Sequence, residues 1–145
     1  MASKISVLID LNIILDVLQK REPFYENSMR VLAAVESEKV IGLVAAHSIS
    51  TLFYLIQKSK SVADARAMLT SLLQFIRIAP INQSTIDQAL NLDYNDFEDA
   101  IQMIAALQNK VDCLITRNVK DYQPPLVKVL QPVEFLATIE GENNL

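Results

Sequence analysis

The stretch ISVLID, residues 5 to 10, is a short apolar run that ends in a carboxylate. Its β-branched residues and its lack of alternation are typical of a strand buried on both faces of a parallel sheet. Similar runs occupy residues 40–46, 75–81, 112–116 and 126–130, with helical patterns between them. Strands that alternate with helices predict an α/β three-layer α/β/α sandwich with a central, mostly parallel five-stranded sheet.

The segments between the expected strands carry helix start and stop signals. A first helix is expected after Asp10 and breaks at Pro23, and a longer one is expected from Tyr25 to Glu38. Ser48 and Ser61 are the expected N-caps of the next two helices. Further helices are predicted over residues 84–91, from about Asp96, and after Pro132.

The bulk properties indicate one soluble domain. A chain of 145 residues has the size of one domain, so we expect a single domain over residues 1–145. Half of the residues, 51%, are hydrophobic, which favours a buried oligomer interface and makes a homodimer the simplest expectation. The sole cysteine, Cys113, lies in an apolar run, so it is expected in the core of a cytoplasmic protein. No apolar run approaches the roughly 18 residues needed to span a bilayer, so no membrane partner is expected.

Charge and composition exclude several classes of site. The net charge of −4 argues against a broad basic face for nucleic acid, although it leaves room for a local site. With two glycines in the chain, neither a Rossmann dinucleotide loop nor a P-loop can be drawn. One histidine and one cysteine exclude a Cys/His metal cluster.

Polar residues follow two of the expected strands directly. In a parallel sheet, functional residues gather beyond the carboxyl ends of the strands, at the point where the strand order reverses. The residues in this position are Asp10 and Asn12 after the first strand, and Thr116, Arg117, Asn118, Lys120 and Asp121 after the fourth.

The stretch DYNDFEDAIQMIAALQ, residues 93 to 108, crowds four acids against the start of an apolar helix. On a helix beginning near Asp96, the side chain of Asp99 lies on the stripe that packs against the sheet, where a lone carboxylate needs a partner. Glu98 lies on a face with Gln102, Ala105 and Asn109 that we expect to be solvated. Asp93 is expected in a solvated loop.

If the acids at the start of this helix lie close to the acids that follow the strands, a bound cation would be needed to offset their repulsion. Two unit charges about 5 Å apart repel by roughly 3 kcal/mol at an effective dielectric constant near 20. A helix cap and the helix dipole together offset less than about 2 kcal/mol, whereas Mg²⁺ prefers carboxylate oxygens and water. The acids Asp10, Asp96, Asp99 and Asp121 therefore form a candidate site for metal-assisted hydrolysis of a phosphate ester. Asp96 has the alternative role of a simple N-cap.

Two segments resemble a known family. VLIDLNIILDVLQKREPF, residues 7 to 24, resembles the opening of PIN domains, and DFEDAIQMIAALQNKVDCLITRNVKDY, residues 96 to 122, resembles their second half. The resemblance covers the chain from about Ile5 to Leu136. It implies a Mg²⁺- or Mn²⁺-dependent endoribonuclease of the kind found in VapC-like bacterial toxins, with RNA as substrate and an antitoxin protein as possible partner.

The resemblance also implies roles for individual residues. Asp10, Asp99 and Asp121 take the positions of the catalytic acids. Asn12 would orient Asp10 or contact substrate, and Thr116 would support it. Asn118 stands where many members have a further Asp. Arg117 and Lys120 are candidates for contacts with RNA phosphates, or for balancing the acids.

The chain departs from the family pattern at one place. Many active members carry a Glu in the helix after the second strand, whereas residues 47–58 contain no acid, and Thr51 or a close neighbour occupies that place. Asp96, one turn before Asp99, is the candidate replacement. The departure keeps a second hypothesis open, a catalytically weak or silent PIN-fold interaction module.

Two phosphotransfer classes are disfavoured by the sequence. A dehalogenase-like phosphatase would need D-x-D where this chain has DLN at residues 10–12, and a receiver domain would need an Asp at the end of the middle strand, where FIRIAPI, residues 75–81, ends without one. His47 is expected to cap or pack rather than to catalyse. Asp16 is expected to be solvated or structural, and Tyr54 is expected in the core.

Overall fold

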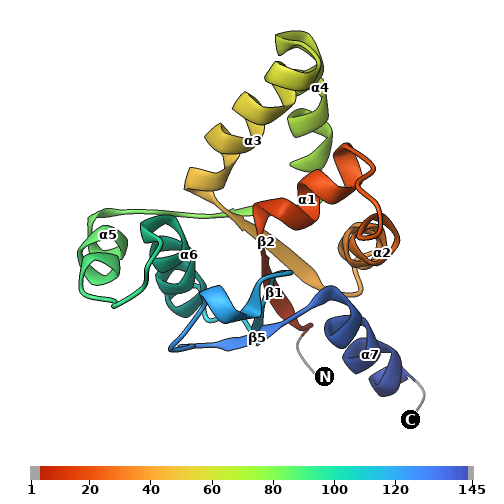
Figure 1. The fold of residues 1–145 in the computed structure, drawn as a ribbon. Coiled ribbons are helices and arrows are strands. Elements are labelled where there is room, and N and C mark those ends of the chain that lie inside the picture. The colour runs from red at the N-terminus through yellow and green to blue at the C-terminus, as the bar shows by residue number, and fades with distance from the viewer. Residues whose placement is uncertain (1–3, 144–145) are drawn as a thin grey trace.

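The structure is a computed structural model that describes residues 4–143. Five strands form one sheet in the order β3-β2-β1-β4-β5, and all four strand pairs are parallel (Figure 1). The predicted strands and their parallel arrangement are confirmed. The strands are β1 (Ser6–Ile9), β2 (Ile41–Ala45), β3 (Arg77–Ala79), β4 (Cys113–Ile115) and β5 (Lys128–Leu130).

Helices fill the connections, as the alternating pattern predicts. They are α1 (Leu11–Leu18), α2 (Tyr25–Glu36), α3 (Ala46–Ser59), α4 (Val62–Leu72), α5 (Gln83–Leu90), α6 (Phe97–Gln108) and α7 (Pro132–Asn143). A short 3₁₀ helix, η1 (Val119–Asp121), follows β4 and was not predicted.

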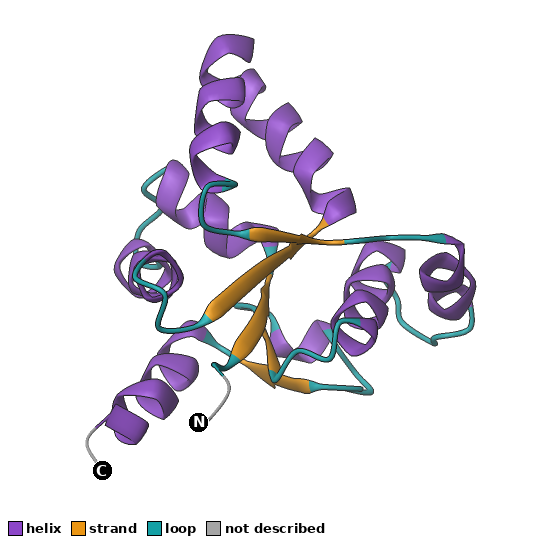
Figure 2. Cartoon of the chain, turned by 180° about the vertical axis from the view of Figure 1, so that it is seen from behind, coloured by secondary structure: helices purple, strands orange, loops and turns teal. Residues whose placement is uncertain are grey.

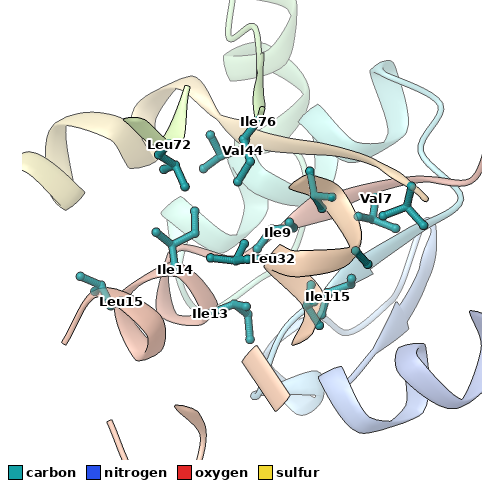
Figure 3. Close-up of a cluster of buried hydrophobic side chains, with 14 of the residues drawn as sticks. Val7, Ile9, Ile13, Ile14, Leu15, Leu32, Val44, Leu72, Ile76 and Ile115 are labelled. Carbon is teal, nitrogen blue, oxygen red and sulfur yellow. The ribbon is translucent and has the colours of Figure 1, made fainter. Parts of the chain in front are cut away.

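The sheet is buried on both faces, which explains why its strands are apolar without alternation. Val7 and Ile9 of β1 point into a large core beneath α1, α2, α3, α4 and α7 (Figure 3). Leu8 points to the opposite face, where it packs with Met103 and Ala106 of α6. Figures 1 and 2 show α5 and α6 on one side of the sheet and α1, α2 and α7 on the other. The three-layer sandwich is therefore confirmed.

The hairpin of α3 and α4 extends away from the sheet (Figures 1 and 2). For this reason the prediction that Tyr54 lies in the core is wrong, since its side chain is 56% exposed on α3. The predicted cap at Ser48 is also wrong, because α3 begins one turn earlier and buries Ser48. The predicted cap at Ser61 is confirmed, since its Oγ accepts the Asp64 backbone N–H at 3.0 Å.

Helix α2 approaches the sheet closely at Gly42 of β2. A Cβ atom built on Gly42 would lie 2.7 Å from a methyl group of Val35, a distance that real Cβ contacts essentially never show. Val35 is itself buried and β-branched, so it has little freedom to move. The absence of a side chain at Gly42 is thus what lets α2 pack here.

Two further expectations concern the core and the helices. Cys113 is buried, as predicted, and its burial raises the pKa of the thiol to about 11. Within residues 4–143, no helix combines the length and the apolar character that crossing a membrane requires.

The strand order brings together the carboxyl ends of β1 and β4, which are far apart in the sequence. From β1 the chain builds outward through β2 and β3 on one side, and through β4 and β5 on the other. Ile9 of β1 pairs with Ile115 of β4, so the next residues along, Asp10 and Thr116, lie side by side at the point where the order reverses.

Candidate active site

Asp10 is anchored at this point by a hydroxyl from the neighbouring strand. Its side chain is 6% exposed, and its Oδ2 accepts the Thr116 hydroxyl at 2.8 Å. Thr116 Oγ1 in turn accepts the backbone N–H of Asn118 at 3.1 Å. Burial raises the pKa of Asp10, and the side-chain hydrogen bonds from Thr116 and Gln102 oppose that rise. Asp10 is thus a buried acid held in a fixed orientation.

Asp99 lies in the first turn of α6 and is half-buried. Burial and then the neighbouring charge of Asp96 raise the pKa of its carboxyl to about 6. The charges of Asp10 and Asp121 act in the same direction, while a hydrogen bond from the Tyr122 hydroxyl at 3.1 Å opposes them. The structure therefore brings the four predicted acids close enough for their charges to interact at Asp99.

A polar pocket of about 290 Å³ opens over three of these acids. Asp10 does not line it and lies deeper in the protein. Acidic and amide side chains, with one lysine, form its wall. The lining residues are Asp93, Asn95, Asp96, Asp99, Lys120, Asp121 and Gln123.

Asp96 has the capping role that its position suggests. Its Oδ1 accepts the backbone N–H of Asp99 at 3.2 Å, so it is the N-cap of α6. Its carboxylate also lines the pocket and raises the pKa of Asp99. One side chain thus caps the helix and adds negative charge to the pocket.

The donor set suits a hydrated Mg²⁺ or Mn²⁺ ion. Mg²⁺ usually binds one or two protein carboxylates and fills its remaining positions with water and substrate oxygens. Burial first, and then repulsion from the neighbouring acids, raises the pKa of Asp99, and a bound cation would offset both. Within residues 4–143, no three His, Cys, Asp or Glu side chains are grouped tightly enough to hold a metal ion by themselves. An ion in this pocket would therefore have one or two protein ligands and keep much of its water.

The remaining predicted residues differ in exposure and in their place in the fold. Lys120 and Asn118 are exposed in and beside η1, and Lys120 lines the pocket. Asn12 is half-buried in the first turn of α1, and its Oδ1 accepts a long hydrogen bond of 3.5 Å from Arg21. Thr51 is half-buried in the second turn of α3.

Arg117 lies outside the acidic pocket. Its Nε is 3.0 Å from Oδ2 of the fully buried Asp16, and its guanidinium stacks 3.8 Å from the ring centre of Phe24. Asp16 is thus structural, one of the two roles considered for it. Arg117 faces a separate cavity of about 170 Å³ between α2 and the start of α7.

Glu98 and Asp93 are exposed, as expected of solvated side chains, but Asp93 also lines the acidic pocket. His47, in the first turn of α3, packs at the start of α6 beside Glu98. Burial lowers the pKa of His47, and the charge of Glu98 opposes that shift. The starts of α3 and α6 are therefore neighbours.

Two buried residues beside the acids were not predicted. Gln102 is 2% exposed and Tyr122 is 1% exposed, and Gln102 Nε2 donates to Tyr122 Oη at 2.6 Å. The prediction that Gln102 and Ala105 lie on a solvated face of α6 is wrong, because this face is buried against the sheet side. Ala105 packs there in one cluster with Leu8 and Tyr122, and Gln102 hydrogen-bonds Tyr122. The nearly continuous apolar run from Ala100 to Leu107 was the available signal.

Comparisons with known proteins agree with this architecture. The chain is similar to Ribonuclease VapC1 of Aquifex aeolicus (strain VF5), with 26% identity over 138 residues that cover 89% of this chain and 92% of that protein. It also resembles a chain of the toxin-antitoxin complex from Klebsiella pneumoniae, with a TM-score of 0.67, 22% identity, and coverage of 87% and 97%.

A third similar protein is a chain of VapBC2 from Rickettsia felis, solved bound to a DNA fragment from its promoter. The TM-score is 0.65 at 17% identity, over 88% of this chain and 98% of that chain. These two solved structures share the fold. The family model described as PIN domain matches residues 6–120, which is most of the chain. The chain therefore belongs to the PIN domain family.

Proposed function

We propose that this protein is a Mg²⁺- or Mn²⁺-dependent endoribonuclease and the toxin of a toxin-antitoxin pair. The observation that carries the proposal is Asp99. Its pKa is raised to about 6 by burial and by the charges of Asp96, Asp10 and Asp121, at the carboxyl edge of a parallel sheet. An arrangement that keeps such repulsion is typical of a cation site.

The side chains around the pocket suggest how the reaction is organised. Asp10 and Asp99 would hold the ion, with Asp121 and Asp96 adding negative charge at the rim. A bound divalent cation supplies charge neutralisation at the phosphodiester and lowers the pKa of an attacking water. Lys120, the one cation of the pocket lining, would bind a phosphate oxygen of the RNA.

The relatives support this class of activity. The similar Aquifex protein is named a ribonuclease, and the two similar solved chains come from toxin-antitoxin assemblies. RNA as substrate and a small antitoxin as partner follow by analogy. We expect the protein to be a homodimer and to act in the cytoplasm. Light scattering of the purified protein tests the dimer. A small DNA-binding protein encoded immediately upstream, co-purifying with this chain, would support the toxin assignment.

The structure also gives a reason to keep a second function. The helix after β2 carries Thr51 where many active family members have a Glu, and no described group of three acids is tight enough to hold an ion by itself. A PIN-fold interaction module with weak or no cleavage has these features too.

One experiment decides between the two functions. RNA cleavage is measured with Mn²⁺ for the wild type, for Asp10→Ala, and for the wild type with EDTA. The matched control is Asp87→Asn, which removes an exposed acid from α5. The nuclease predicts cleavage in the wild type and in Asp87→Asn only. If the wild type neither cleaves RNA nor binds Mn²⁺, the nuclease proposal fails and the interaction module is the better account.

A further inference from the structure

The two deepest acids of the candidate site each accept a hydrogen bond from a buried hydroxyl. Thr116 donates to Asp10 at 2.8 Å, and Tyr122 donates to Asp99 at 3.1 Å. Tyr122 is 1% exposed and does not line the acidic pocket, so its hydroxyl is out of reach of an RNA strand. Any influence of Tyr122 on the reaction must therefore pass through Asp99.

The direction of the hydrogen bonds at Tyr122 is fixed by its neighbours. A phenol has one hydrogen to donate, and an amide N–H can only donate. Gln102 Nε2 lies 2.6 Å from Tyr122 Oη, so the phenol oxygen accepts there. Its own hydrogen is left for the Asp99 carboxylate, which accepts it at Oδ1. The chain of donors thus runs from Gln102 through Tyr122 to Asp99.

The same amide also serves the other acid. The polar side chain of Gln102 also lies beside Asp10 and favours its ionised form, which lowers the pKa of Asp10. Gln102 is on α6 and Asp10 follows β1, so one buried amide connects two acids that come from different layers of the fold. Burial of the amide at 2% exposure keeps water from competing for these bonds.

We propose that Tyr122 is a positioning residue that holds one oxygen of Asp99 so that the other faces the pocket, ready for a divalent cation. Gln102 holds Tyr122 and Asp10 in the same arrangement. The inference rests on the proposed function, because it assigns a task toward the cation of that site. Groups that orient metal-binding carboxylates in this way typically change metal affinity 10- to 100-fold when removed.

The chain offers a matched control for removing the hydroxyl. The ring of Tyr94 packs edge-on against Tyr122 with 6.3 Å between centroids, and its hydroxyl donates to the Pro124 carbonyl at 2.6 Å. Tyr122→Phe and Tyr94→Phe thus delete the same atom from neighbouring rings. Only the first deletion removes a donor to an acid of the site.

The test is calorimetric titration of Mn²⁺ alone into metal-free wild type, Tyr122→Phe, Tyr94→Phe and Asp10→Ala, with thermal unfolding measured in parallel. We expect the Kd for Mn²⁺ to rise about 10-fold in Tyr122→Phe and to stay unchanged in Tyr94→Phe. The Mn²⁺ concentration for half-maximal RNA cleavage should rise with the Kd, while KM for RNA stays constant. Gln102→Met, which removes the amide that donates to Tyr122 and favours the ionised form of Asp10, should weaken Mn²⁺ binding at least as much and serves if Tyr122→Phe does not fold.

The outcomes separate this inference from the proposed function. If the wild type binds Mn²⁺, Asp10→Ala does not, and Tyr122→Phe binds as tightly as the wild type, Tyr122 is only structural and the inference is overturned. The proposed function stands in that case. If the wild type itself binds no Mn²⁺, both are overturned.

Discussion

The guanidinium of Arg117 and the carboxylate of Asp16 form a buried ion pair, with 3.0 Å between Nε and Oδ2. The Ser28 hydroxyl donates to the same Asp16 oxygen at 2.9 Å, and Phe24 lies under the guanidinium. The loop after β4 is thereby fastened to α1 and α2. Arg117, a candidate for contacts with RNA phosphates or for balancing acids, thus pairs with an acid and joins the loop after β4 to two helices from the start of the chain.

Replacing Arg117 by Gln should therefore lower stability strongly. The substitution leaves the Asp16 carboxylate buried without its counter-charge, and breaking such a pair typically costs about 3–5 kcal/mol. Urea unfolding of the metal-free protein measures the effect. Arg30→Gln is the matched control, because the pair of Arg30 with Glu140 is 44% and 53% exposed and should contribute less than about 1 kcal/mol. Equal losses in the two variants would contradict the structural role of Arg117.

Replacing Asp99 by Asn should raise the stability of the metal-free protein at pH 7.5. The folded state raises the pKa of this carboxyl from its ordinary 3.8 to about 6, so keeping it ionised opposes folding above pH 6. This cost declines as the pH falls from about 6 to about 4, because the folded protein then binds the proton first. Since Asp99 is half open to solvent, we expect a gain of about 1 kcal/mol at pH 7.5 that vanishes near pH 4.

Urea unfolding at the two pH values measures this change, with Asp87→Asn as the control for loss of an exposed acid. Saturating Mn²⁺ should reverse the order at pH 7.5, because an ion that binds only the folded wild type stabilises it by about 2.7 kcal/mol at 100 times its Kd. A gain in Asp99→Asn that persists at pH 4 would show that charge repulsion is not its cause.

Replacing Thr116 by Val should weaken Mn²⁺ binding, with Thr116→Ser as the conservative variant that restores it. Valine keeps the volume of the fully buried side chain but removes the donor to Asp10 at 2.8 Å. We expect a Kd for Mn²⁺ about 10-fold higher in Thr116→Val and close to the wild type in Thr116→Ser. Calorimetric titration checks both, and equal affinities in the two variants would rule out the hydroxyl as the cause.

The two glycines should respond to alanine in opposite directions. In Gly42→Ala the new Cβ meets Val35 at 2.7 Å, and overpacking of this kind costs about 1–3 kcal/mol. At Gly141 in α7 a Cβ meets nothing within 4 Å, so alanine should stabilise the helix by about 0.5–1 kcal/mol. Thermal unfolding of both variants measures the signs. Destabilisation by both would mean that the close approach of α2 to β2 is not the reason for the cost.

The fold was predictable from the sequence because a strand that is buried on both faces is a continuous apolar run in the sequence. Each strand is an apolar run, and runs such as residues 5–10 and 112–116 need no knowledge of their partners to be recognised. The position of Asp10 and Thr116 beyond paired strands followed from the same rule. Asp96 and Asp99 were likewise placed by helical spacing.

The positions of Gln102 and Arg117 were not predicted, because they depend on contacts with distant segments that produce no pattern in the neighbouring sequence. Helical spacing placed Gln102 beside the buried stripe of α6, on a face expected to be solvated, whereas Tyr122, from the segment after β4, packs there and bonds Gln102. Arg117 likewise pairs with Asp16 only because α1 packs beside the loop after β4. Such pairings arise only once whole elements meet, so the spacing of residues along the chain does not reveal them.

The bond between Thr116 and Asp10 spans 106 positions of the chain. Because β4 supplies Thr116 and the segment after it supplies Tyr122, a ribosome that has made only the first hundred residues exposes Asp10 without either partner. Contacts so distant in sequence form late, since the intervening chain must first be ordered. The acidic centre is therefore completed only after β4 has paired with β1 and the segment that carries Tyr122 has reached α6.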